Sequence, residues 1–175
     1  MATNISDLTI RMKNLVGFRV GEVPYAVDIY RVREITKPLP LLTLPHMPAE
    51  VIGVVDHRGD VVPVIDLRIR FGLQPRESRR EERWIIVKRS DVLIKKGDRL
   101  AGLVVDKVTE VFGAGESQQR GVPEIGKGNE SRGIASAYSY KGKLVFVIDV
   151  DRITSIADEV DTQEVHKQLQ ERSEQ

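Results

Sequence analysis

The strongest constraint on the fold is a hairpin sequence that occurs twice. Residues 53–72 read GVVDHRGDVVPVIDLRIRFG, so two apolar runs flank a polar turn at 56–60. β-Branched residues dominate both runs, and Gly59 stands where a tight turn requires a residue that tolerates positive φ. This pattern predicts a β-hairpin. The segment KGKLVFVIDV at 141–150 matches RGDVVPVIDL at 58–67, position by position, with an offset of 83 residues.

A second matched pair precedes each hairpin. Residues 21–35 match residues 97–111 with an offset of 76, and both blocks end in a basic residue, Val, any residue, Glu and an aliphatic residue. Two blocks that match in the same order indicate a duplicated unit. Each unit is too short to bury a large core alone, so we expect the two to pack into one body.

The remaining pattern is that of many short strands. Strands are expected over 15–20, 25–29, 84–87, 100–105, 134–140 and 143–150. We expect a helical turn within 29–35, a solvated linker over 75–83, a mobile loop over 113–133 and a helix opened by a capping box at Ser155 and Asp158. Pro63 lacks a backbone N–H, which places its strand at a sheet edge or a bulge. A mainly β chain of this kind favours small barrels or a sandwich.

Composition excludes several classes of protein. A hydrophobic content of 41% is enough for a core, and the chain carries 27 basic against 26 acidic residues, which gives no argument for nucleic acid or an anionic membrane. With no cysteine, disulfides, zinc–thiolate sites and cysteine nucleophiles are excluded. No run of apolar residues resembles a signal peptide or a membrane span, so we expect a soluble intracellular protein.

Candidate catalytic groups are few. Asp56, His57 and Asp66 could form a base with an orienting carboxylate, but no nucleophile accompanies them, which makes a hydrolase an unfavoured alternative. The segment GVPEIGKG at 121–128 resembles a phosphate loop but ends in Gly128 where a Ser or Thr hydroxyl is needed. The three histidines have no spacing typical of a metal site. The sequence therefore predicts no enzyme, no metal and no cofactor.

Two features suggest contacts with other proteins. Arg58 occupies the hairpin turn, and exposed arginines offer a planar fork of donors to partners, although most have no specific role. Residues 37–48, KPLPLLTLPHMP, hold four prolines with leucines and Met47 between them. This segment is expected to be a surface loop that tucks its leucines into the core, with an exposed apolar patch for a partner as the less favoured alternative.

At this point the residues resemble a known family, the CheW coupling proteins of bacterial chemotaxis. Residues 53–68 are similar to its signature, roughly G-V-x-N-L-R-G followed by aliphatic residues, Pro and Asp-Leu. Residues 25–35 and 103–108 are similar to two further motifs of the family, and Pro48 stands at the expected distance before the signature. The resemblance extends from about Leu15 to Ala157.

The resemblance implies a fold and a function. The expected fold is mainly β, with two pseudo-symmetric five-stranded SH3-like β-barrel lobes that share an apolar core, plus short helices and a C-terminal helix. We expect a single domain over 14–157, with lobe 1 at about 15–74 and lobe 2 at about 83–153, and flexible termini at 1–13 and 165–175. The implied function is that of a non-catalytic adaptor that couples the cytoplasmic tip of chemoreceptors to the regulatory domain of a CheA-type histidine kinase. Such an adaptor is cytoplasmic, peripheral to receptor arrays, and binds neither nucleic acid nor the membrane interior.

The resemblance also implies which residues meet the partners. The receptor-facing positions are Val32, Glu34, Gly53 and Arg58, and the expected kinase-facing residues are Leu41, Leu44 and Met47. The chain departs from the family at Asp56 and His57, where Asn and Leu are common, which suggests a different receptor choice in a specialised chemosensory system. The alternative function is a duplicated SH3-like module that binds a peptide or single-stranded nucleic acid, although such binding to nucleic acid favours a basic groove with stacking aromatics.

Overall fold

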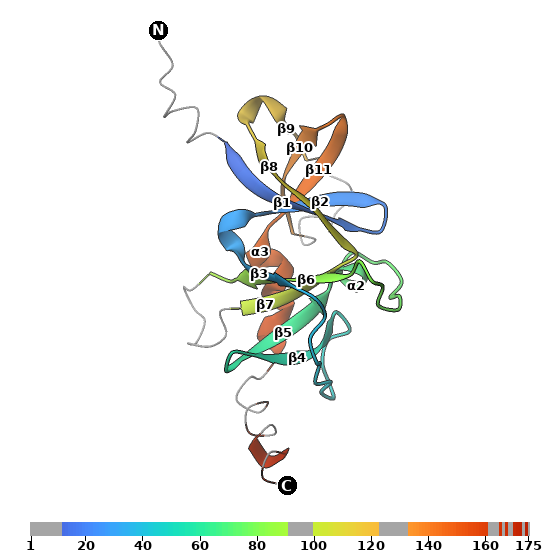
Figure 1. Ribbon diagram of the computed structural model, residues 1–175, viewed down its shortest axis with the longest axis vertical. Coiled ribbons are helices and arrows are strands. Elements are labelled where there is room, and N and C mark those ends of the chain that lie inside the picture. The colour runs from blue at the N-terminus through green and yellow to red at the C-terminus, as the bar shows by residue number, and fades with distance from the viewer. Residues whose placement is uncertain are drawn as a thin grey trace.

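The computed structural model describes residues 12–90, 100–122, 133–160, 165, 167, 170–172 and 174. Sheet A contains β1 (Lys13–Val20), β2 (Val23–Asp28), β8 (Lys107–Ala114), β9 (Gln119–Arg120), β10 (Ile134–Tyr140) and β11 (Lys143–Ile148), in the order β8-β1-β2-β11-β10-β9. Sheet B contains β3 (Val32–Thr36), β4 (Val51–His57), β5 (Asp60–Asp66), β6 (Arg83–Lys88) and β7 (Leu100–Val105), in the order β3-β6-β7-β5-β4. The two sheets form two lobes, A and B, stacked along the long axis (Figure 1).

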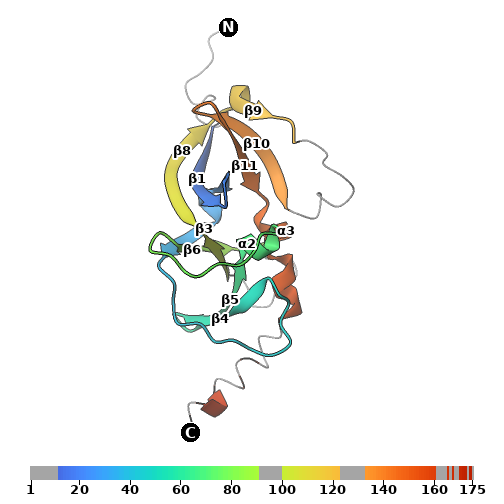
Figure 2. The ribbon, with the colours of Figure 1, turned by 90° about the vertical axis from the view of Figure 1, so that its right-hand side faces the viewer.

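Short helices connect these strands. They are the α-helices α2 (Leu67–Arg70) and α3 (Val150–Thr154) and the 3-10 helices η1 (Ile29–Arg31), η2 (Glu116–Gln118) and η4 (Ser155–Glu159). Within the described residues, no helix is long and apolar enough to cross a membrane. Figure 2 shows α3 beside the junction of the two lobes.

The two sheets are built on one plan, which confirms the internal duplication. In sheet A, β2 runs parallel to β11 with Ala26 opposite Val147, and in sheet B, β7 runs parallel to β5 with Gly102 opposite Val64. These two pairs are related by the sequence offsets of 76 and 83 residues. The two parallel pairs therefore have equivalent registers in the two halves of the repeat.

The strands are nevertheless exchanged between the repeats. The hairpin β1–β2 pairs with strands β8 and β11 from the second half of the chain, whereas β6–β7 pairs with β3 and β5 from the first half. The sequential division into lobes at 15–74 and 83–153 therefore does not coincide with the division into sheets. The physical reason is that β1–β2 and β6–β7 are equivalent hairpins, and each completes the sheet of the other repeat.

Matched turns and caps explain why the two hairpins fold alike. Arg58 and Gly59 adopt φ of 54° and 88°, and Lys141 and Gly142 adopt 49° and 74°. Two successive positive φ values are typical of the type I′ turn that fits the strand twist of a hairpin. After each hairpin an aspartate caps a short helix: Asp66 accepts from the N–H of Arg68 at 2.8 Å, and Asp149 accepts from that of Arg152 at 3.2 Å.

The largest apolar cluster lies between the lobes, which confirms the expected shared core. It is made by one face of each sheet together with α3, and its fully buried members include Phe18, Val27, Ile65, Ile85, Leu103 and Ile153. Each lobe also holds its own smaller cluster, around Leu15 and Phe112 in lobe A and around Val62 and Trp84 in lobe B. Most of the burial that fixes the lobes relative to each other therefore comes from the shared cluster.

Four sequence expectations are wrong in detail. Sheet A has six strands instead of the expected five, because residues 119–120, within the segment expected to be a loop, form β9 and pair with β10. The helical turn within 29–35 stops at Arg31, because the next residues form β3 and pair with β6, a long-range contact that overrides the local pattern. The strand with Pro63 is interior to sheet B, which is tolerated because the ladder to β7 begins only at Val64. The helix expected at Ser155 begins earlier, at the Asp149 cap.

Candidate docking site

The candidate site lies where the two edge strands of sheet B meet. Glu34 stands on β3 and His57 ends β4, and the His57 Nε2–Glu34 Oε2 distance is 2.7 Å. Arg58 Nη2 lies 3.6 Å from the same oxygen. Because β3 and β4 occupy opposite ends of the sheet order, this contact ties together the two edges of lobe B. Their side chains differ in exposure, at 9% for His57, 35% for Glu34 and 73% for Arg58.

The electrostatics keep Glu34 ionised. The hydrogen bond from His57 is the main cause that lowers the pKa of Glu34; partial burial opposes it, and the positive charge of Arg58 adds to it. An ionised carboxylate only accepts hydrogen bonds, which assigns the donor role to His57 Nε2. The corner thus presents one anchored carboxylate and one guanidinium that remains largely in solvent. Ile35, the next residue on β3, is 40% exposed but points to the opposite face of the strand from Glu34.

The other two residues assigned to the receptor take different positions. Val32 is half-buried against the shared core. Gly53 is buried, and a Cβ added there would lie 2.5 Å from the backbone O of Leu42 and 2.8 Å from Cγ of Leu41. Gly53 is therefore the place where a loop crosses β4 in close contact. Of the four receptor-facing candidates, only Glu34 and Arg58 contact each other directly.

The crossing loop is the proline-rich segment 37–48. Leu42 and Val54 form a two-way backbone bridge, with N···O distances of 2.8 and 2.9 Å. Leu44 and Met47 are half-buried against Val54 and other apolar residues of lobe B. Leu41 is 37% exposed. The loop thus does both things that its sequence suggested: it packs leucines inward and leaves an apolar side chain outside.

The residues considered for catalysis serve separate structural contacts. Asp56 Oδ1 accepts from the N–H of Gly59 at 2.9 Å and so shapes the turn. Asp66 caps α2, and burial raises its pKa against the lowering effect of the N–H of Arg68. Within the described residues, no group of three or more His, Asp or Glu side chains is placed to hold a metal ion. Most of segment 121–128 lies outside the described residues.

Sequence reasoning missed the role of His57, which it treated as an unfavoured catalytic candidate and as a departure from a family pattern. The side chain is instead buried and bonded to Glu34, 23 residues away. Exposure alternates along β3, and Glu34 lies on the less exposed face with Val32 and Thr36, so strand alternation would not have placed it outward. His57 could be assigned to it only after the pairing of β3 with β6 was known.

Comparisons with known proteins agree with this architecture. A family model described as a CheW-like domain matches residues 14–158. Chemotaxis protein CheW of Rhizobium meliloti is 28% identical over 153 residues, covering 87% of this chain and 94% of the relative, and chemotaxis protein CheW of Helicobacter pylori is 31% identical over 140 residues, covering 79% of each. The crystal structure of scaffolding protein TtCheW from Thermoanaerobacter tengcongensis superimposes with a TM-score of 0.71 at 29% identity, covering 85% of this chain and 94% of that one. The chain therefore belongs to the CheW family.

Proposed function

We propose that this protein is a non-catalytic adaptor that couples chemoreceptors to a CheA-type histidine kinase in a chemosensory array. The observation that carries the proposal is the corner at the edge of lobe B, where Arg58 is exposed beside an anchored Glu34 in a CheW-type fold. In this proposed role the protein works in the cytoplasm, at the inner face of membrane receptor arrays.

The chemistry of the corner suits a helical partner. Arg58 offers the five N–H donors of a planar guanidinium, and its contact to Glu34 is long enough, at 3.6 Å, to be exchanged for a carboxylate of the partner. Glu34 keeps its bond to His57 during that exchange and can accept from a donor of the partner. A receptor hairpin with an acidic residue and a hydrogen-bond donor on one face fits these groups.

The loop at Leu41 is the proposed contact for the kinase. Leu41 is exposed, while Leu44 and Met47 hold the loop onto lobe B. The Leu42–Val54 bridge fixes this loop to β4, the strand that ends at the receptor corner. Both proposed surfaces therefore belong to one rigid lobe. A receptor movement would then bias the kinase between its conformations through a population shift, without chemistry in the adaptor itself.

Charge reversal at the corner tests the receptor assignment. Arg58→Glu places two carboxylates side by side, and we expect binding to a receptor signalling tip to weaken by at least about thirtyfold, the scale of an arginine hot spot. The matched control is Lys141→Glu, at the equivalent turn of lobe A, where Lys141 is 69% exposed. Circular dichroism should show both variants folded. Wild-type receptor binding by Arg58→Glu would remove Arg58 from the site.

Nothing favours the alternative of a nucleic-acid-binding module. Binding of single strands uses aromatic side chains on which bases stack. Among the described residues, Tyr30 is the one aromatic side chain with high exposure, at 76%. A lone tyrosine offers no stacking platform along a strand.

A further inference from the structure

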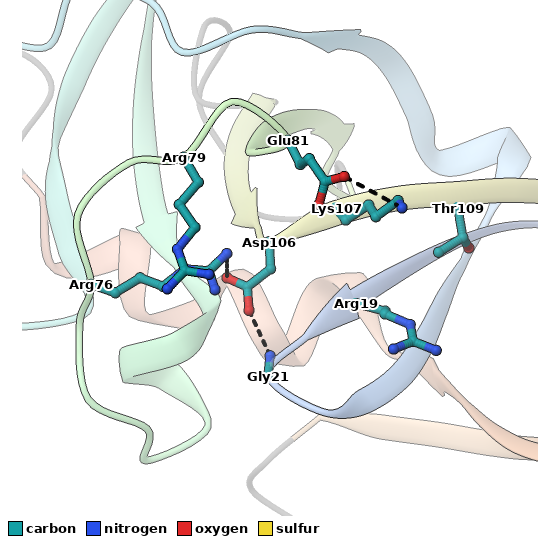
Figure 3. Close-up of a pocket in the computed structure, with 8 residues that line it drawn as sticks. All are labelled: Arg19, Gly21, Arg76, Arg79, Glu81, Asp106, Lys107 and Thr109. Atoms are coloured by element: carbon teal, nitrogen blue, oxygen red, sulfur yellow. Dashed lines mark hydrogen bonds and ion pairs between the residues drawn. The ribbon is translucent and has the colours of Figure 1, made fainter.

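A polar cavity of about 600 Å³ lies at the junction of the lobes (Figure 3). Its walls come from β1, the β1–β2 turn, the start of β8 and the connector, which we define as residues 71–82 between α2 and β6. Four cationic side chains, Arg19, Arg76, Arg79 and Lys107, face only two anionic ones, Glu81 and Asp106. In Figure 1 the connector lies at the right and the β4–β5 turn at the lower left, so this cavity is separate from the Arg58 corner.

The negative charge of Asp106, at the centre of the cavity, is already fully neutralised by groups of the protein. Asp106 Oδ2 accepts from the N–H of Gly21 and from Arg68 Nη1, both at 2.7 Å, and Oδ1 lies 3.3 Å from Arg76 Nη2. The side chain of Asp106 is only 12% exposed. Two guanidinium groups and one amide thus surround a single negative charge, which leaves the centre of the cavity with an excess of positive charge.

Further cations remain available around this centre. The guanidinium groups of Arg19 and Arg79 make no hydrogen bond or ion pair within the part of the chain that the structure describes. Arg79 reaches from the connector toward Asp106, and Arg19 extends from β1 on the opposite side of that carboxylate (Figure 3). Lys107 is 3.6 Å from Glu81, with exposures of 50% and 66%, so this pair is weak.

We infer that this cavity binds a multiply charged phosphate anion. A guanidinium group donates paired, charge-assisted hydrogen bonds to phosphate oxygens. Several guanidinium groups at one place offer more donors than a single carboxylate ligand would use. The volume is within the range of small-ligand sites and is more than sufficient for an anion of diphosphate size. The described lining has no aromatic side chain, so the recognised feature is the phosphate charge and not a stacked base.

Such a ligand would act as a bridge. It would join Arg79 of the connector to Arg19 of β1, and thereby hold the segment that links α2 to β6 in lobe B against sheet A. Binding to the folded state alone raises stability in proportion to the logarithm of ligand concentration. This site does not depend on the proposed coupling function.

Calorimetric titration with inorganic pyrophosphate at constant ionic strength tests the inference. We expect saturable binding at one site per chain, weakened about tenfold or more by either Arg19→Ala or Arg79→Ala, since each removes charge-assisted hydrogen bonds. Arg80→Ala is the matched control, because Arg80 is exposed and adjacent to Arg79 but does not line the cavity. Arg58→Glu should bind pyrophosphate as the wild type does, which separates this site from the receptor corner.

Three results would overturn the inference. One is the absence of saturable pyrophosphate binding by the wild-type protein. Another is an equal loss in Arg80→Ala, which would reduce the effect to general charge attraction. The third is citrate binding as tightly as pyrophosphate in a parallel titration, which would show that the cavity recognises carboxylates equally well. Circular dichroism of each variant establishes that the protein measured is folded.

Discussion

Gly53→Ala should destabilise the protein because the loop crosses β4 at backbone contact distance. The new Cβ would lie 2.5 Å from the carbonyl O of Leu42, and this oxygen cannot rotate away as a side chain could. Relief requires the loop to shift, at the expense of the two Leu42–Val54 hydrogen bonds, at about 1 kcal/mol each. Displacing the apolar side chains of the loop adds about 1 kcal/mol. Gly53 also has a φ of +156°, so backbone strain adds about 1 kcal/mol, and we expect a loss of about 4 kcal/mol in the free energy of unfolding.

The assay is urea unfolding followed by tryptophan fluorescence and circular dichroism, with Gly59→Ala as the control. Gly59 has a φ of +88° but no atom within 4 Å of its added Cβ, so its substitution costs only the backbone strain, about 1 kcal/mol. The difference between the two losses in free energy of unfolding measures the cost of the close contact between the loop and β4. Equal losses would refute the reasoning, since the contact with Leu42 would then have no energetic consequence.

Two further predictions concern titrating groups. Burial would raise the pKa of Asp151, but hydrogen bonds from Arg31 and Ser90 outweigh it and lower that pKa to about 2. At pH 7, Asp151→Asn should therefore lower the free energy of unfolding by about 1 kcal/mol, a value discounted because the Asp151 side chain is 42% exposed. When unfolding is measured against pH, the difference from wild type should fade as the pH drops from 4 toward 2. A difference that stays constant over this range would contradict the prediction. His57→Leu removes the bond that lowers the pKa of Glu34, so NMR titration should show that pKa rise toward its ordinary value, and an unchanged pKa would assign the shift to Arg58 instead.

Local sequence signals predicted the parts of this fold that are local in the structure. The two type I′ turns follow from Arg58-Gly59 and Lys141-Gly142. The helix after β5 was not predicted, although the aspartate that ends this strand is a typical helix-capping residue. The exchange of hairpins between repeats was not predictable in this way. Equivalent hairpins satisfy either sheet locally, and the choice is made by packing of both sheets on the shared core.

The candidate site likewise combines a residue that the sequence could identify with contacts that it could not. Arg58 was identifiable because a turn position exposes it, and the family signature names it. Its partners depend on pairing across the chain: Glu34 reaches His57 only because β3 and β4 lie at opposite edges of one curved sheet. Gly53 was taken for a contact residue, whereas its burial under Leu42 is visible only in three dimensions. Sequence thus indicates which residues matter more readily than it indicates what they touch.

The measurement that tests the central claim most directly is a three-component retention assay. A receptor signalling tip is immobilised, and retention of a CheA-type kinase is measured with and without this protein. The account predicts that the kinase is retained in quantity only when the wild-type protein is present, and that Arg58→Glu abolishes this retention. Equal retention of the kinase without the protein, or receptor binding by the protein that recruits no kinase, would contradict the claim that one rigid body connects the two partners.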